Sequence, residues 1–269
     1  MKTPQPTTRA ALSAALPLLA MAAAGCPVTQ SQDTPVPHLK RREAITRETY
    51  YLYVPSGYKG ERPWPLVVTC HGTYGFDDAR RQIKEWKALA EDNGFIVVAP
   101  DLKSTQGVLP VISPLRRRDL ARDEKTILAV MAELKRQYRI DDDAVMITGY
   151  SAGGFPMYYT ALQHPELFSV VVSRLANCDM KMVRDIPVTE ETRKIHFLIF
   201  FSKRGINPAS SNLNPVARES WAIFRHLREH ACYRADIEKV EGGHRRLPTP
   251  AVAFWKERQP ELWERPNEE

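Results

Sequence analysis

The sequence has few cysteines and no pattern that would hold a metal ion or a nucleotide phosphate. Its 269 residues include four cysteines, Cys26, Cys70, Cys178 and Cys232, and none of their spacings is the Cys-x-x-Cys of zinc sites. A Gly-x-Gly-x-x-Gly loop and internal repeats are also missing. We therefore expect no metal ion and no other cofactor.

A continuous basic stripe is missing as well. The net charge is +6, but the arginines are scattered, and the only tight basic runs are Lys40-Arg41-Arg42 and Arg116-Arg117-Arg118. A nucleic-acid partner would require positive charge gathered on one face beside a reading element. We interpret both runs as solvated surface and expect no nucleic-acid partner.

The N-terminal residues 1–25 have the pattern of a signal peptide. Lys2 and Arg9 precede an apolar stretch over 10–24, which is too short to span a bilayer comfortably. The stretch ends in Ala23-Ala24-Gly25-Cys26, which resembles a bacterial lipobox. We predict lipidation of Cys26 and a bacterial lipoprotein anchored to a membrane surface. The alternative is cleavage near Ala24 and a soluble periplasmic or extracellular protein.

Residues 26–44 follow as a flexible tether, because the segment from Val28 to Pro37 is rich in Thr, Gln, Ser and Pro. Residues 45–269 have the length and composition of one globular domain, which we expect to be a monomer. If Cys26 carries lipid, one disulfide at most is left, and Cys178 with Cys232 is the candidate pair in an oxidising compartment.

Apolar runs of strand length alternate with stretches of helical period along the domain. Strands are expected over residues 46–54, 66–70, 95–99, 144–148, 168–173, 195–201 and 233–240, and helices over 80–91, 119–138, 152–163, 215–230 and 251–258. The segment 175–192 is expected to be mostly irregular. This alternation predicts an α/β fold with a mostly parallel, twisted sheet and helices on both faces.

The sharpest local pattern is Ile147-Thr148-Gly149-Tyr150-Ser151-Ala152-Gly153-Gly154-Phe155, a Gly-x-Ser-x-Gly sequence between a strand and a helix. A tight turn of this kind lifts the serine hydroxyl clear of both elements. We predict Ser151 as a nucleophile and the Ala152 N–H as one donor of an oxyanion hole.

A serine nucleophile needs a base, which in such a chain order follows the last strand. His244 occupies that place, behind Gly242 and Gly243. The second oxyanion donor is expected in the turn after the strand 66–70, at Thr73 with Tyr74 as the alternative.

The acid that should orient the histidine is harder to find. The loop after the strand 195–201 reads Ser-Lys-Arg-Gly-Ile-Asn-Pro-Ala and contains no carboxylate. Two candidates stay open: Asp179, which follows the preceding strand, and Asn207, whose amide oxygen could accept the imidazole N–H. Glu241 is a third and weaker candidate, because it is too close to His244 in the chain.

The chain resembles the α/β-hydrolases of the polyhydroxybutyrate depolymerase and feruloyl/acetyl-xylan esterase-like group. The matching residues are Tyr53-Val54-Pro55-Ser56-Gly57-Tyr58, Pro65-Leu66-Val67-Val68 with His71-Gly72, Gly149-Tyr150-Ser151-Ala152-Gly153-Gly154, and Gly243-His244. The resemblance implies an α/β-hydrolase fold and a secreted serine esterase that forms an acyl-enzyme on a small or polymeric ester.

Two other functions compete with the esterase. The missing acid in the loop 202–209 suggests a non-catalytic binding protein on the same scaffold, and a serine peptidase of the same fold is the third hypothesis. If the chain is an esterase, the aromatic residues near the motifs are candidate walls of an acyl pocket: Tyr74, Phe76, Tyr150 and Phe155.

Overall fold

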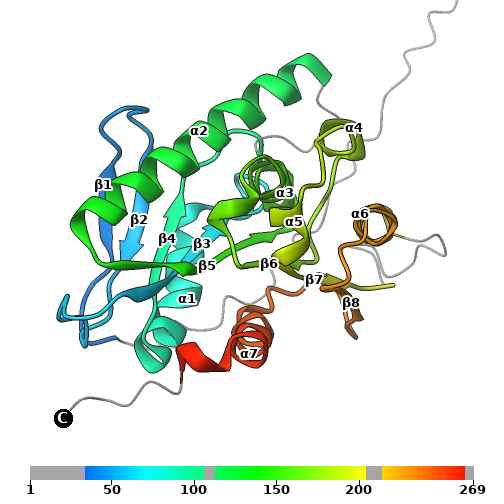
Figure 1. Ribbon diagram of the computed structural model, residues 1–269. Coiled ribbons are helices and arrows are strands. Elements are labelled where there is room, and N and C mark those ends of the chain that lie inside the picture. Colours follow the sequence, from blue (N-terminus) through cyan, green and yellow to red (C-terminus); the bar gives the residue numbers. More distant parts are fainter. Residues whose placement is uncertain (1–33, 106–112, 204–213, 264–269) are drawn as a thin grey trace, which may run out of the picture.

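The computed structural model describes residues 34–105, 113–203 and 214–263 (Figure 1). The predicted signal peptide, the predicted lipidation site Cys26 and the candidate Asn207 lie outside the described residues. Within those residues, no helix combines the length and the apolar character needed to cross a bilayer.

One eight-stranded sheet forms the centre of the molecule, in the order β1-β2-β4-β3-β5-β6-β7-β8. β1 and β2 pair antiparallel with each other, β2 pairs antiparallel with β4, and every later pair is parallel. The strands are β1 Leu39–Arg42, β2 Thr49–Tyr53, β3 Trp64–Cys70, β4 Ile96–Pro100, β5 Ile140–Tyr150, β6 Val170–Arg174, β7 His196–Phe201 and β8 Ala235–Lys239. The predicted fold class, a mostly parallel α/β sheet, is confirmed.

Helices cover both faces of the sheet (Figure 1). One face packs on α1 (Ala79–Asn93) and α7 (Pro248–Arg258), which share an apolar cluster that includes Trp86 and Trp255. The other face packs on α2 (Ser113–Gln137), α3 (Gly154–Gln163) and α6 (Pro215–Glu229), around a second cluster that includes Leu134 and Tyr158. The strands between them are buried on both sides, as the continuous apolar runs predict.

Some structure lies where none is expected from the sequence. β1 falls inside the range 26–44 that we assign to the tether; its Leu-Lys-Arg-Arg sequence carries no alternation, and backbone pairing with β2 fixes it. Two short helices, α4 (Met180–Val183) and α5 (Glu190–Lys194), interrupt the segment expected to be irregular. Both helices begin at a residue whose side chain caps the first turn, Asp179 for α4 and Thr189 for α5. A helix of one turn is stabilised more by such a cap than by an apolar period.

The three described cysteines, Cys70, Cys178 and Cys232, are buried free thiols. The disulfide considered for Cys178 and Cys232 is therefore not formed. Cys178 lies instead beside the thioether of Met180, with 3.8 Å between the sulfur atoms. Burial raises the pKa of all three thiols, which keeps them protonated and unreactive.

Candidate active site

The turn after β5 holds Ser151 in a strained backbone conformation. Its φ of +53° lies in the left-handed region, which a residue with a side chain rarely adopts. The neighbouring elements cross so closely that a Cβ on Gly153 would lie 2.3 Å from the Cys70 carbonyl oxygen. A Cβ on Gly149 would lie 2.6 Å from the Gly153 carbonyl oxygen. The Gly-x-Ser-x-Gly pattern is therefore required by packing.

The helix after the turn begins with a single 3₁₀ turn, η1 (Ser151–Gly153), before α3 starts at Gly154. The switch from 3₁₀ to α geometry places Pro156 in the first turn of α3, where its missing N–H has no acceptor to lose. At the same time, the N–H of Ala152 stays at an open helix start.

The loop after β6 and the helix α6 hold the Ser151 turn in place. The Asn177 N–H donates to the Ser151 carbonyl oxygen at 2.8 Å. Glu219 of α6 accepts in turn from the Asn177 side-chain amide at 2.8 Å and from the Cys178 N–H at 3.0 Å. The orientation of Ser151 thus depends on a carboxylate 68 residues further along the chain, 219 minus 151.

The turn after β3 presents its backbone to the same place, and a Cβ on Gly72 would lie 3.3 Å from the Ser151 Cβ. The Gly72 N–H donates to Asp77 Oδ2 at 2.7 Å, and the Tyr74 N–H donates to the Thr105 carbonyl oxygen at 3.2 Å. Among the described residues, no acceptor faces the Thr73 N–H. Of the two predicted donors, Thr73 is therefore the better placed to receive an oxyanion.

His71 braces this turn through both of its ring nitrogens. The Leu102 N–H donates to its Nε2 at 3.0 Å, so the proton of the neutral ring sits on Nδ1, 2.8 Å from the Gly72 carbonyl oxygen. His71 is buried, and its two ring nitrogens tie the turn to the loop after β4.

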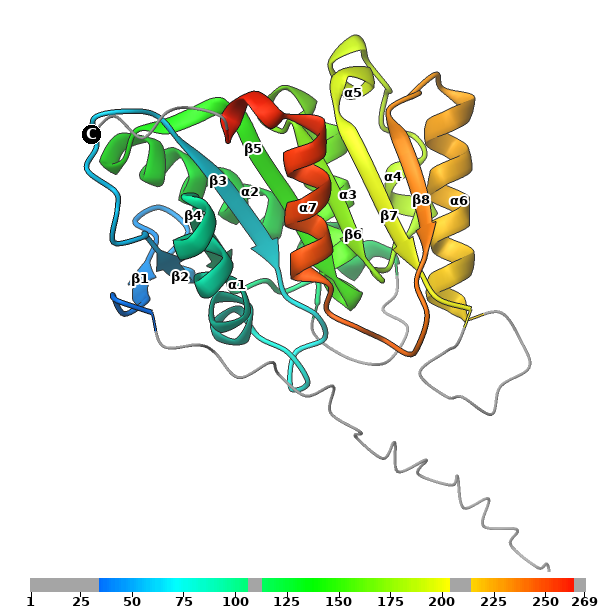
Figure 2. The ribbon, with the colours of Figure 1, turned by 90° about the horizontal axis from the view of Figure 1, so that it is seen from below.

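His244 lies in the segment between β8 and α7, which passes along the edge where the parallel strands end (Figure 2). Its ring stacks on Tyr150, the residue before Ser151, with 4.7 Å between ring centroids and 34° between planes. Burial, and then the positive charge of Arg246, lower the pKa of His244 to about 4, against a smaller opposing effect of Asp77. The imidazole is therefore neutral, the form that a general base needs.

The candidates for the third member of the triad have different surroundings. Asp179 caps α4 by accepting the Lys181 N–H at 3.1 Å, and the charged groups near it include Arg116 and Glu219. Asn207 lies outside the described residues. Glu241 is exposed and pairs with Lys239 at 2.5 Å.

The aromatic residues near the motifs divide into two kinds. Tyr74 and Phe76 are 61% and 53% exposed, beside the candidate oxyanion donor. Tyr150 is buried under His244. The Arg116 guanidinium covers Phe155, with 4.0 Å between the guanidinium carbon and the centroid of the Phe155 ring. Only the first two are free to line a substrate path.

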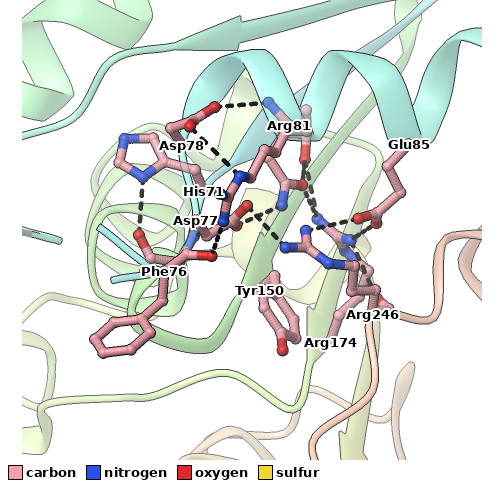
Figure 3. A network of polar contacts seen from close by, with 12 residues as sticks. His71, Phe76, Asp77, Asp78, Arg81, Glu85, Tyr150, Arg174 and Arg246 are labelled. Atoms are coloured by element: carbon pink, nitrogen blue, oxygen red, sulfur yellow. Dashed lines mark hydrogen bonds and ion pairs between the residues drawn. The ribbon is translucent and has the colours of Figure 1, made fainter. Parts of the chain in front are cut away.

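A buried ionic network lies beside Tyr150 and the turn after β3 (Figure 3), and it was not predicted. Arg246 donates through Nη1 to Glu85 at 2.8 Å and through Nη2 to Asp77 at 3.0 Å. Arg174, fully buried at the end of β6, donates to the other Glu85 oxygen at 2.6 Å. Neutral partners complete it: Thr69, Gln82 and Thr148. The available signal was an arginine that ends a run of apolar strand residues.

In the described part of the chain, no group of three or more His, Cys, Asp or Glu side chains is arranged to hold a metal ion. The candidate reactive groups are the Ser151 hydroxyl, the backbone N–H groups near it and the His244 imidazole, which stacks on the adjoining Tyr150.

Comparison with known proteins places this architecture. A family model described as the prolyl oligopeptidase family matches residues 82–197. The structure of a ferulic acid esterase from Anaeromyces mucronatus superposes with a TM-score of 0.60 over 84% of this chain and 92% of that one, at 14% identity. The chain therefore has the α/β-hydrolase fold. The predicted fold is thereby confirmed.

Relatives of known activity match a smaller part of the chain. A poly(3-hydroxyalkanoate) depolymerase of Paucimonas lemoignei is 29% identical over 122 residues, and a bifunctional acetylxylan esterase/xylanase of Neocallimastix patriciarum is 24% identical over 124 residues. These alignments cover 44% and 46% of this chain, but only 29% and 17% of the respective relatives. The chain thus aligns with under a third of the length of each relative.

Proposed function

We propose that this α/β-hydrolase is a serine esterase that hydrolyses carboxylic esters through an acyl-enzyme intermediate. The observation that carries the proposal is the strained Ser151 turn with the neutral His244 ring stacked on the adjoining Tyr150. This arrangement supports Ser151 as the nucleophile and His244 as the base at one edge of the sheet.

In the proposed mechanism, His244 takes the Ser151 proton while the hydroxyl oxygen attacks the ester carbonyl. The tetrahedral oxyanion accepts hydrogen bonds from the Thr73 and Ala152 N–H groups, and His244 then returns the proton to the leaving alkoxide. In deacylation His244 takes a proton from a water molecule as the water oxygen attacks the acyl carbonyl. The bond to the Ser151 oxygen then breaks, that oxygen takes the proton back from His244, and the carboxylic acid is released. The third member stays open between Asp179 and Asn207.

For the substrate, we propose an ester within a polyester or attached to a carbohydrate. The support is the esterase and depolymerase activity named for the relatives. Exposed Tyr74 and Phe76 beside the site offer flat apolar surface for such a chain to lie on. Export and a lipid anchor at Cys26 complete the proposal, and we expect the wild type, but not Cys26→Ser, to incorporate labelled palmitate in a bacterial host.

Turnover of p-nitrophenyl acetate by the wild type and by Ser151→Ala tests the activity. We expect the variant to lose roughly 10⁶-fold in kcat, the scale of removing a serine nucleophile from a hydrolase. A fluorophosphonate probe should label the wild type stoichiometrically. Equal turnover by both proteins, together with no labelling, would leave the non-catalytic binding protein as the better account.

A serine peptidase is the second candidate, because the matching family model is that of prolyl oligopeptidases. The same wild type and Ser151→Ala proteins are assayed on peptide p-nitroanilides. Ser151-dependent cleavage of these amides at a rate above that of the acetyl ester would replace the esterase proposal with the peptidase.

A further inference from the structure

Two parts of the proposed catalytic machinery come from distant parts of the chain. The oxyanion turn, Gly72–Thr73, follows β3, whereas His244 follows β8. A productive hydrolase must hold the two within a fraction of an ångström of their working positions. The described contacts show a direct physical link between them.

Asp77 is that link, because its two carboxylate oxygens point to different halves of the site. Oδ2 accepts the Gly72 N–H at 2.7 Å, which fixes the turn from behind. Oδ1 accepts from Arg246 Nη2 at 3.0 Å, two residues after His244. The Asp77 side chain is only 2% exposed, so solvent does not compete for either bond.

Arg246 carries the link to the histidine. Its guanidinium lies 4.9 Å from the Tyr150 ring centroid, and the same ring stacks on His244 at 4.7 Å. Its two terminal nitrogens bind two different carboxylates, Asp77 and Glu85, which fixes the plane of the guanidinium (Figure 3). A lysine ammonium lacks this fork and cannot reproduce both bonds in one fixed plane.

We propose that Asp77 and Arg246 are positioning residues that hold the oxyanion turn and His244 in register with Ser151. The inference rests on the proposed function, and it goes further by assigning the alignment of the base to this ion pair. Neither residue touches the substrate in this account. Each acts through the backbone or the ring that it holds.

The test compares kcat and KM for p-nitrophenyl acetate in Arg246→Gln, Arg246→Lys and Asp77→Asn, all below their melting temperatures. We expect kcat to fall about 10²-fold in Arg246→Gln, the scale of a small misplacement of catalytic groups, with little change in KM. Arg246→Lys should recover part of this loss. A matched control is Arg258→Gln, which removes an ion pair with Asp236 at 2.9 Å and a cation–ring contact with Phe254, both remote from the site.

A pH profile separates positioning from a loss of stability alone. The charged groups that act on His244 are Arg246, which disfavours its protonation, and Asp77, which favours it. Removing the Arg246 charge should therefore move the acid limb of kcat/KM to higher pH. The limb of Arg258→Gln should stay in place.

Wild-type kcat in folded Arg246→Gln would overturn the inference. If that variant does not fold, wild-type kcat in both Arg246→Lys and Asp77→Asn would overturn it equally. The proposed function is tested separately. If the wild type and Ser151→Ala turn over the ester equally, both the esterase proposal and the positioning role are wrong. If turnover depends on Ser151 but the Asp77 and Arg246 variants keep the wild-type kcat, only the positioning role is wrong.

Discussion

The environment of the His244 ring sets the acid limit of activity. Its pKa is lowered to about 4, first by burial and then by Arg246, with Asp77 opposing. The neutral ring is the base and persists down to that pKa, so kcat/KM should fall only near pH 4 rather than near 6.5. A pH–rate profile with a stopped assay checks this, and an acid limb close to 6.5 would contradict it.

The same shift has a consequence for stability, and its sign is fixed by proton uptake. Between pH 6.5 and about 4, His244 is largely protonated in the unfolded protein but neutral in the folded one. The unfolded state therefore binds more protons in that window, and this contribution to stability is lost as the pH falls through it. Replacement by Gln, which does not titrate, should flatten this part of the stability profile.

The two glycines before His244 differ in whether a side chain could replace the glycine hydrogen without strain. Gly242 has a φ of +92°, a conformation that side chains rarely adopt, whereas a Cβ on Gly243 would meet nothing within 4 Å. We expect Gly242→Ala to destabilise the protein by about 1–2 kcal/mol through backbone strain. Gly243→Ala is the matched control and should be neutral or stabilising by up to about 1 kcal/mol. Urea unfolding measures both, and equal effects would contradict the distinction.

Single functional residues can be predicted from the sequence where they belong to a local sequence pattern. Ser151 lies in a nine-residue motif and His244 at a fixed place in the order of strands, so both could be named in advance. Asp77 and Arg246 are 169 residues apart and bear no motif, and only the fold reveals their pairing. The sequence offered Asp179 as an acid because it follows a strand, but its capping bond to Lys181 could not be foreseen.

Among the elements, those with a strong period were predicted well and those held by single contacts were not. The buried strands β3, β4 and β7 and the amphipathic helices α1 and α6 match the expected ranges within about two residues at most boundaries. Longer departures occur where no apolar pattern marks the end of an element. β5 extends back to Ile140 through three aspartates, and α2 starts at Ser113 rather than near Asp119.

The N-terminus of α1 offers a test of capping. The Asp78 side chain accepts the Arg81 N–H at 2.7 Å, in the extended conformation of an N-cap. We expect Asp78→Ala to destabilise the protein by about 1 kcal/mol, while Asp78→Ser, which keeps an acceptor, should lose much less. The exposed ion pair of Asp78 with Arg81 adds little, so Arg81→Gln separates the two effects. Equal losses in the Ala and Ser variants would argue against the cap.

On the scale of the whole molecule, two apolar clusters pack on opposite faces of the sheet. The ionic network lies at the edge of the sheet where the parallel strands end. The network joins strands, helix α1 and the segment before α7 through Asp77, Glu85, Arg174 and Arg246. Two carboxylates and two guanidiniums leave it without net charge, which burial demands. The alternation of strands and helices predicts the layers, but the charge balance depends on side chains from four segments.

Arg174 tests this balance, because its side chain is 0% exposed and its partners come from β3, β5 and α1. Arg174→Met keeps the bulk but leaves a buried excess of negative charge, so we expect a loss of about 3–5 kcal/mol in unfolding free energy. Arg174→Met/Glu85→Gln restores neutrality and should recover part of that loss. If the double variant is as unstable as the sum of the two single ones, the arginine contributes through its hydrogen bonds and not through charge balance.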